Sequence, residues 1–167
     1  MDAVDRHIEQ WRTERPDLPE EGLAAMALFG RLGRLVGLVG PAIEAVFARH
    51  RLTTGEFDVL AALRRAGHPF VLTPGVLART MMLSPAAMTN RLDRLEAAGM
   101  IARSLDPANR RSMRVELTAD GRRAVDAAVA EHVANEQRLL DPLTPADRVE
   151  LDRLLRVLLG HLEPDAR

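Results

Sequence analysis

The 167-residue sequence contains no cysteine and no lysine, and several marks of an enzyme are missing from it. Without cysteine the chain has no disulfide framework, no thiol nucleophile and no cysteine-ligated zinc site. It shows no glycine-rich phosphate loop and no nucleophile elbow. The five histidines, at positions 7, 50, 68, 132 and 161, are scattered without a metal-binding spacing. These absences argue against an enzyme and against a metal or other cofactor.

The sequence also has little that predicts a membrane span. The longest charge-free stretch in the apolar N-terminal half covers residues 35–43, whereas a transmembrane helix needs about 20 apolar residues. No cationic and then apolar leader opens the chain. We therefore expect a cytoplasmic protein with no membrane partner. Apolar residues make up 47% of the chain, enough to bury the core of one domain or of one domain with an appended helical layer.

The basic residues are unevenly distributed, although the formal net charge of the whole chain is only −1. Between residues 64 and 114 there are nine arginines and three acidic residues, a net charge of +6, which leaves −7 on the rest. A basic middle between acidic ends is typical of a phosphate-binding module. Arginine favours bidentate phosphate and base contacts, but a GC-rich coding bias also explains the lack of lysine, so only the clustering is informative.

Capping residues and apolar spacing predict the order of elements in the middle of the chain. Thr54 is the expected N-cap of one helix, and Pro74 opens a short second helix after a brief extended segment. Ser84 and Pro85 form the N-cap and first helical position of a third helix, which stops at Gly99. Two alternating segments then flank a turn that contains proline, asparagine and two arginines. Helix, short strand, two helices and a two-stranded wing are the order of a winged helix-turn-helix.

Long apolar helices are predicted on both sides of this module. A short helix over residues 1–12 precedes a long helical pattern over residues 23–50, which Pro41 should kink or divide. Thr118 caps a further helix, and the last amphipathic helix begins near Pro145. Helices of this kind bury best against a second copy, so we expect a homodimer. The expected division is 1–52 for N-terminal dimerisation helices, 53–117 for the winged helix-turn-helix, and 118–167 for C-terminal dimerisation helices.

The third helix of the module is the candidate recognition helix. At about 100° per residue, its core-facing stripe comprises Met88, Leu92, Leu95 and Gly99. The opposite face carries Ala86, Asn90 and Asp93, with Thr89 at its edge, and Asn90 can pair with adenine in the major groove. Asp93 would repel phosphate unless it meets a cytosine amino group or an arginine. Arg94 lies further round, within reach of backbone or bases.

The turn of the predicted wing carries Arg110 and Arg111, close to Arg103 and Arg114. An arginine-bearing hairpin tip suits a narrow minor groove, whereas a solvated loop is the alternative for this turn taken alone. Together the helix and the wing predict contact with double-stranded DNA. The expected DNA-binding residues are Ser84, Pro85, Ala86, Thr89, Asn90, Arg94, Arg110 and Arg111.

A second group of residues suggests a ligand pocket. Asp58 interrupts an otherwise apolar segment, and a carboxylate there is costly unless it is paired or partly hydrated. Arg91 flanks the buried stripe of the recognition helix, and Arg79 lies on the preceding helix. Trp11 is the only tryptophan. Two guanidiniums, a carboxylate and an aromatic ring suit a flat anionic heterocycle. The alternative is a buried ion pair of Asp58 with Arg79 or Arg91, with Trp11 only anchoring its helix.

The block RLDRLEAAGMIARSLDPANRRSMRVELTADG, residues 91–121, resembles the MarR (multiple antibiotic resistance regulator) family of bacterial transcription factors. The shared features are a Leu-Glu-x-x-Gly stop, an arginine-tipped wing and a Leu-Thr-x-x-Gly entry to the next helix, and the resemblance covers about residues 23–162. Asn109 stands where the family usually has aspartate before the paired arginines, which leaves Asp106 as the acidic residue that could brace an arginine of the wing. The resemblance implies a homodimer on a pseudo-palindromic operator, usually a repressor released by a small molecule.

One subgroup of this family, the urate-responsive regulators, has a tryptophan in an additional N-terminal helix, an aspartate before the helix-turn-helix and one arginine in each of its two helices. Trp11, Asp58, Arg79 and Arg91 are similar to that quartet. The resemblance implies that a small anionic aromatic effector, such as urate, binds both arginines, disturbs Asp58 and pulls the recognition helix out of register. Related regulators respond to other purines, phenolic acids or antibiotic-like carboxylates. A ligand-independent winged-helix interaction protein is a further alternative.

Overall fold

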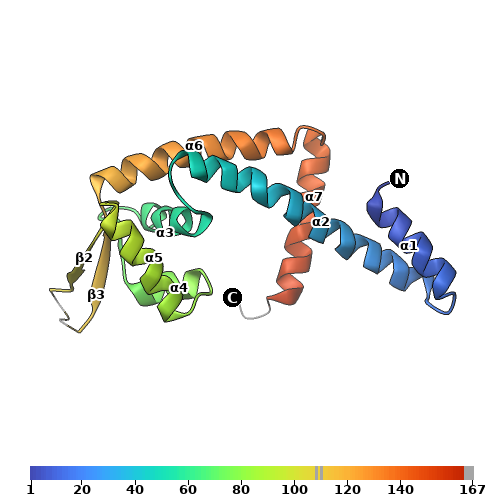
Figure 1. The fold of residues 1–167 in the computed structure, drawn as a ribbon, viewed down its shortest axis with the longest axis horizontal. Helices are drawn as coiled ribbons and strands as arrows, with labels where there is room; N and C mark the ends of the chain where they lie inside the picture. The colour runs from blue at the N-terminus through green and yellow to red at the C-terminus, as the bar shows by residue number, and fades with distance from the viewer. Residues whose placement is uncertain (108, 110, 164–167) are drawn as a thin grey trace. The chain divides into compact units, whose positions relative to one another are not determined.

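The computed structural model describes residues 1–107, 109 and 111–163, which form seven helices and one three-stranded sheet (Figure 1). The elements are α1 (Ala3–Glu14), α2 (Glu20–Arg49), α3 (Thr54–Arg65), β1 (Val71–Leu72), α4 (Pro74–Thr80), α5 (Pro85–Ala97), β2 (Ile101–Leu105), β3 (Met113–Leu117), α6 (Ala119–Leu139) and α7 (Pro145–Leu162). The predicted fold class, mainly α with a small β-wing, is confirmed. The chain divides into two compact units, Met1–Ala45 and Val46–Arg167.

In the first unit, α1 packs against the beginning of α2. Asp2 caps α1 by accepting hydrogen bonds from the Val4 and Asp5 backbone N–H groups, at 2.7 and 2.9 Å, and Asp5 returns a bond to the Asp2 N–H at 2.8 Å. This capping box fixes the start of the helix. Val4, Ile8 and Leu23 then form a small buried cluster between the two helices.

The long helix α2 differs from its prediction at Pro41. The proline was expected either to kink the helix or to end one helix and begin another. The structure has one helix from Glu20 to Arg49 with Pro41 inside it, so the expectation of two helices is wrong. A proline inside a helix removes one backbone hydrogen bond and crowds the carbonyl of residue i−4. Apolar residues at spacings of three and four continue on both sides of Pro41, and that continuing pattern favours one helix over two.

Helix α2 is also long and apolar enough to cross a membrane by length and composition alone, with a mean hydropathy of 1.5 over an 18-residue stretch. Core helices of soluble proteins pass the same test, so this is weak evidence for a span. Only 6% of that stretch is buried within the chain. Leu28, Phe29, Val36 and Leu38 are each more than half exposed, so these apolar side chains in the middle of α2 lack a cover within a single chain.

The second unit contains the winged helix-turn-helix in the predicted order. Its sheet is antiparallel with strand order β1-β3-β2, and β2 pairs with β3 from Ile101 opposite Leu117 to Leu105 opposite Met113. Figure 1 shows this hairpin extending beyond α5. The core between α3, α4, α5, β3 and α6 is formed by fully buried side chains that include Leu60, Leu63, Leu77, Met88, Leu92, Leu95, Val115 and Val125.

The helix starts in this unit follow from their capping residues, with one correction. Ser84 and Thr118 cap α5 and α6 as predicted. The N-cap of α3 is Thr53 and not Thr54: Thr53 Oγ1 accepts from the Glu56 N–H at 3.3 Å, and Glu56 Oε2 accepts from the Thr53 N–H at 2.9 Å. A capping box requires the glutamate three residues after the cap, and Glu56 has that spacing from Thr53, not from Thr54.

The Leu-Thr-x-x-Gly sequence at the start of α6 fastens this helix to the end of α5. Thr118 Oγ1 donates to the Gly99 carbonyl at 2.8 Å and accepts from the Gly121 N–H at 3.0 Å. The Thr118 N–H donates to the Met100 carbonyl at 3.1 Å. A Cβ on Gly121 would lie only 2.0 Å from the Met100 oxygen. Glycine is therefore required here because two backbone segments meet where a side chain has no space.

Candidate DNA interface and ligand pocket

The exposed face of α5 carries small and hydrogen-bonding side chains. Ser84 Oγ accepts from the Ala87 N–H at 3.3 Å, and Pro85 occupies the first turn. Ala86, Thr89 and Asn90 are exposed. Thr89 Oγ1 donates back to the Pro85 carbonyl at 3.0 Å. Such a surface can approach the edges of base pairs closely because its exposed side chains are small.

Asp93, whose charge would repel phosphate, is paired with an arginine of the wing. Arg103, on β2, places Nη1 2.8 Å from Asp93 Oδ1 and donates from Nε to Glu96 Oε2 at 2.9 Å. The Arg103 backbone N–H also donates to Glu96 Oε1 at 3.2 Å. The side-chain hydrogen bond from Arg103 lowers the pKa of Glu96. One arginine thus provides the partner that Asp93 required and joins the wing strand to the recognition helix.

Arg94 is held in place by the first turn of α3. Its Nε donates to Glu56 Oε1 at 2.8 Å, while 60% of the Arg94 side chain and only 12% of the Glu56 side chain are exposed. Burial alone would raise the pKa of Glu56, but hydrogen bonds from Thr53 and Arg94 outweigh it, so the pKa is lowered. A buried charge that is fully hydrogen-bonded makes a firm anchor. Arg94 is oriented by Glu56 while most of its side chain faces solvent.

The wing turn is closed by backbone hydrogen bonds on either side of Asn109. The Asp106 N–H donates to the Ser112 carbonyl at 2.9 Å, and the Ser112 N–H donates to the Asn109 carbonyl at 2.7 Å. Asn109 Oδ1 accepts from the Arg111 N–H at 3.2 Å, so this residue supports the turn despite departing from the family pattern. Arg111 is exposed. Arg110, also predicted to contact DNA, lies outside the described residues.

A cavity of about 280 Å³ lies between α3, the end of α4 and α5. Its lining residues are Asp58, Arg65, Thr80, Met81, Leu83 and Arg91. Of the four residues predicted to bind a ligand, the structure brings Asp58 and Arg91 to this cavity. Arg79 is exposed and lies outside the lining. Trp11 belongs to the other compact unit, where it lies beside a hollow lined by His7, Gln10 and Glu14.

Arg65 is the lining residue that the sequence reasoning missed. It lies seven residues after Asp58 on α3, two helical turns further along, so both side chains fall on the same side of the helix. That spacing is a signal that could have identified it. The cavity therefore holds two cationic side chains: Arg91 from α5, which is one of the predicted ligand residues, and Arg65 from α3, where the prediction named Arg79 on α4.

Asp58 is half-buried in this cavity. Burial raises the pKa of its carboxyl, and electrostatic interactions with Arg91, Arg65 and His132 act in the opposite direction without cancelling the effect. Within the described part of the chain Asp58 forms no salt bridge, so the ion pair with Arg79 or Arg91 that the sequence left open is not formed. A carboxylate and two arginines without salt bridges to described residues therefore line the cavity.

Arg91 connects the cavity to the start of α3. Its Nη1 donates a long hydrogen bond of 3.4 Å to the Gly55 carbonyl. A Cβ on Gly55 would lie 2.4 Å from Arg91 Cζ, so the guanidinium occupies the space that the glycine leaves open. Arg91 and Arg94, about one turn apart on α5, both contact this first turn of α3. The recognition helix is thus attached to the helix that carries Asp58.

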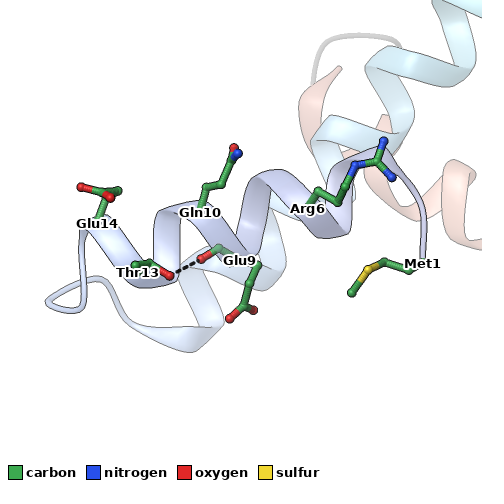
Figure 2. A pocket seen from close by; sticks show the side chains of 6 residues that line it. All are labelled: Met1, Arg6, Glu9, Gln10, Thr13 and Glu14. Carbon is green, nitrogen blue, oxygen red and sulfur yellow. Dashed lines mark hydrogen bonds between the residues drawn. The ribbon is translucent and has the colours of Figure 1, made fainter.

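A larger hollow, of about 630 Å³, lies along α1. Figure 2 shows its lining residues: Arg6, Glu9, Gln10, Thr13 and Glu14 lie along α1, and Met1 lies on the segment before it. Thr13 Oγ1 donates to the Glu9 carbonyl at 3.0 Å, and the Glu9 carboxylate pairs with Arg12. Among the described residues no cluster of three or more candidate metal ligands occurs.

The C-terminal helices expose a long apolar surface. No residue of α7 is buried. The exposed apolar side chains of α6 and α7 include Val129, Val133, Leu139, Leu151, Leu154, Leu155, Leu158 and Leu159. Apolar surface of this extent on a folded chain marks an interaction surface.

The structure has a recognition helix, α5, which packs on α3 and α4 and is joined to the wing by Arg103. This arrangement defines a winged helix-turn-helix DNA-binding protein. Comparison with known proteins agrees: the family model described as the MarR family matches residues 51–112. The HTH-type transcriptional regulator PecS of Dickeya dadantii is 38% identical over 156 residues, which cover 93% of this chain and 90% of the relative. The chain belongs to the MarR family. It is a transcription regulator and not an enzyme, as the sequence predicted.

Two solved structures extend the comparison. A mutant MarR from E.coli complexed with operator DNA is 27% identical, with a TM-score of 0.66 over 77% of this chain and 94% of that chain. BpsR of Bordetella bronchiseptica is 31% identical, with a TM-score of 0.62 over 77% of this chain and 98% of that chain. That structure concerns the mechanism by which 6-hydroxynicotinic acid regulates DNA binding by BpsR.

Proposed function

We propose that the protein is a homodimeric repressor that binds a pseudo-palindromic operator and is released by a small anionic aromatic ligand such as urate or a related purine. The observation that carries this proposal is that α5 contributes to two surfaces at once. Asn90 lies on its exposed face, while Arg91, the next residue, lines the cavity beside Asp58. A ligand held by Arg91 acts directly on the helix that reads DNA.

The DNA contacts follow from the geometry of α5 and the wing. The small face of α5 enters the major groove, where Asn90 reads a base, and the wing arginines approach the minor groove. Arg94 contacts the phosphate backbone from its position on Glu56. The full set is Ser84, Pro85, Ala86, Thr89, Asn90, Arg94, Arg110 and Arg111, as predicted from the sequence.

A second copy of the chain covers the apolar surfaces of α2, α6 and α7. In this arrangement residues 1–52 and 118–167 form the dimerisation layer, and residues 53–117 form the DNA-binding part. A two-fold dimer presents two copies of α5 to two half-sites, so operator symmetry matches protein symmetry. The exposed leucines of α7 support this assembly. A dimeric operator-binding protein acts where the DNA lies, in the cytoplasm.

The cavity favours an anion because two arginines and one carboxylate line it. Urate is a flat anion with several N–H groups, which suits this set of charges. The 6-hydroxynicotinic acid named for BpsR is an aromatic acid of similar size, and that likeness favours an aromatic carboxylate as the second candidate effector. The ligand draws Arg91 away from the Gly55 carbonyl, and α5 shifts relative to α3. The half-sites are then no longer matched to the dimer.

DNA binding is tested by gel shift with the promoter DNA upstream of the protein's own gene at several salt concentrations. We expect affinity to fall linearly on a log–log plot against salt, because phosphate contacts release counterions. Arg110→Ala combined with Arg111→Ala should weaken binding to all sequences, whereas Asn90→Ala should relax the preference at one base position. Arg153→Ala, which removes the same charge from α7, is the control. Binding that ignores salt, or equal losses in all variants, would contradict the proposal.

Release is tested by adding urate, xanthine, 6-hydroxynicotinate or salicylate to the protein–promoter complex. One of these ligands should dissociate the complex and raise the melting temperature of the free protein by mass action. Arg91→Ala and Asp58→Ala should abolish both responses. A complex that survives every ligand, or responses that persist in both variants, would overturn the proposed effector site.

A further inference from the structure

We infer that Arg65 is the second cationic anchor of the effector, in the place that the sequence pattern gave to Arg79. The inference rests on the proposed function, because it assigns a role within the proposed ligand site. Asp58 and Arg65 come from the same side of α3, and Arg91 faces them from α5. The remaining lining residues, Thr80, Met81 and Leu83, come from the end of α4 and the turn that follows.

Arg79 is directed elsewhere by helix geometry. Thr80, its neighbour on α4, lines the cavity, and adjacent side chains on a helix point about 100° apart. Arg79 is exposed, and its Nη1 lies 3.8 Å from the position that a Cβ on Gly75 would take, one turn back on the same helix. The Arg79 guanidinium therefore lies along the outside of α4, and Thr80 lines the cavity in its place.

Arg65 is available to a ligand. Within the described part of the chain its guanidinium donates no hydrogen bond and forms no salt bridge, unlike Arg64 beside it, whose Nε donates to Asp126 Oδ1 at 2.8 Å. The positive charge of Arg65 is near enough to Asp58 to act on the pKa of its carboxyl. Arg65 thus lies beside the cavity with its donors uncommitted.

The charges of the lining define the chemical class of the ligand. Arg65 and Arg91 together with Asp58 give a net charge of +1, which a monoanion neutralises. The two guanidiniums bind the anionic edge, and Asp58 accepts a hydrogen bond from an N–H or O–H group on the ligand. Met81 and Leu83 supply apolar contact for a flat ring. The site therefore selects an aromatic monoanion that carries a hydrogen-bond donor, as in urate or 6-hydroxynicotinate, over one without a donor, such as nicotinate.

Isothermal titration with urate and with 6-hydroxynicotinate tests the assignment. Arg65→Gln should weaken binding of the ligand by about tenfold or more, because a charge-assisted hydrogen bond is lost. Arg64→Gln is the matched control one position away, and Arg79→Gln should bind like that control. Arg65→Lys should recover part of the affinity by restoring the charge. Melting temperatures of all four variants establish that they are folded.

The outcomes separate this inference from the proposed function. A wild-type protein that binds neither probe overturns the effector function, and the role of Arg65 with it. A wild-type protein that binds, with Arg65→Gln as tight as Arg64→Gln, overturns the role of Arg65 alone. Loss of binding in Arg79→Gln, with Arg65→Gln unaffected, restores the original pairing of Arg79 with Arg91. A folded Arg65→Gln variant that alone loses the ligand supports the assignment.

Discussion

Replacing Gly121 by alanine tests the packing that fixes the wing against α6. The new Cβ would lie 2.0 Å from the Met100 carbonyl oxygen and 3.0 Å from Leu117 Cδ1, where ordinary contact begins at 3.4 Å. The obstructing atom is backbone, so the two segments must separate. Overpacking of this kind costs about 1–3 kcal/mol. The hydrogen bonds of Thr118 to Met100 and Gly121 are strained as well, at about 1 kcal/mol each.

Alanine also improves helix propensity over glycine by about 1 kcal/mol, so we expect a net loss of about 2–4 kcal/mol in the free energy of unfolding. Urea denaturation followed by circular dichroism measures this loss, at one fixed protein concentration because association changes apparent stability. Gly75→Ala is the control: its Cβ meets nothing closer than 3.8 Å, so it should be neutral or stabilising. A Gly121→Ala protein within about 0.5 kcal/mol of wild type would refute the close contact.

Further predictions concern the wing, the cavity and the apolar surface. Arg103→Met should remove the side-chain link between the wing and α5 and leave Asp93 and Glu96 without their arginine partner near the phosphates. Operator affinity in a gel shift should therefore fall more than in the Arg153→Ala control. Burial raises the pKa of Asp58 above its ordinary value of 3.8. The contribution of this carboxyl to folding stability is therefore fully present below pH 3.8 and is lost as the pH rises through the raised pKa. The stability gain of Asp58→Asn should therefore grow with pH and then level off in urea denaturation, and a constant gain would contradict this. Leu155→Glu on α7 should shift the protein towards single chains in sedimentation, and an unchanged mass would count against the dimer surface.

Helix starts could be predicted from the sequence because they depend on capping residues a few positions away. Ser84 and Thr118 were identified as caps because a hydroxyl before a helix satisfies its first N–H groups. The same rule, applied without the Glu56 partner, placed one cap at Thr54 instead of Thr53. At Pro41 the local signal misled in another way: the proline predicts a break, but the apolar pattern on both sides of it favours one continuous helix more strongly.

The site was predictable where residue type and helical spacing carry it. The small exposed face of α5 and the place of Arg91 beside the buried stripe both follow from a 3.6-residue period. An arginine was one of the two partners expected for Asp93, and only the fold, which brings β2 beside α5, identifies it as Arg103. Arg65 was missed because the resemblance to the urate-responsive regulators pointed to Arg79. Only the direction of α4, which turns Thr80 and not Arg79 toward the cavity, distinguishes the two arginines.

The central claim is that two copies of this chain bind one DNA duplex through phosphate contacts and α5. Sedimentation of a labelled promoter duplex with the protein, repeated across salt concentrations, tests it most directly. The account predicts two chains per duplex and an affinity that falls steeply with salt. Single chains that do not associate with duplex DNA, even at low salt, would contradict it.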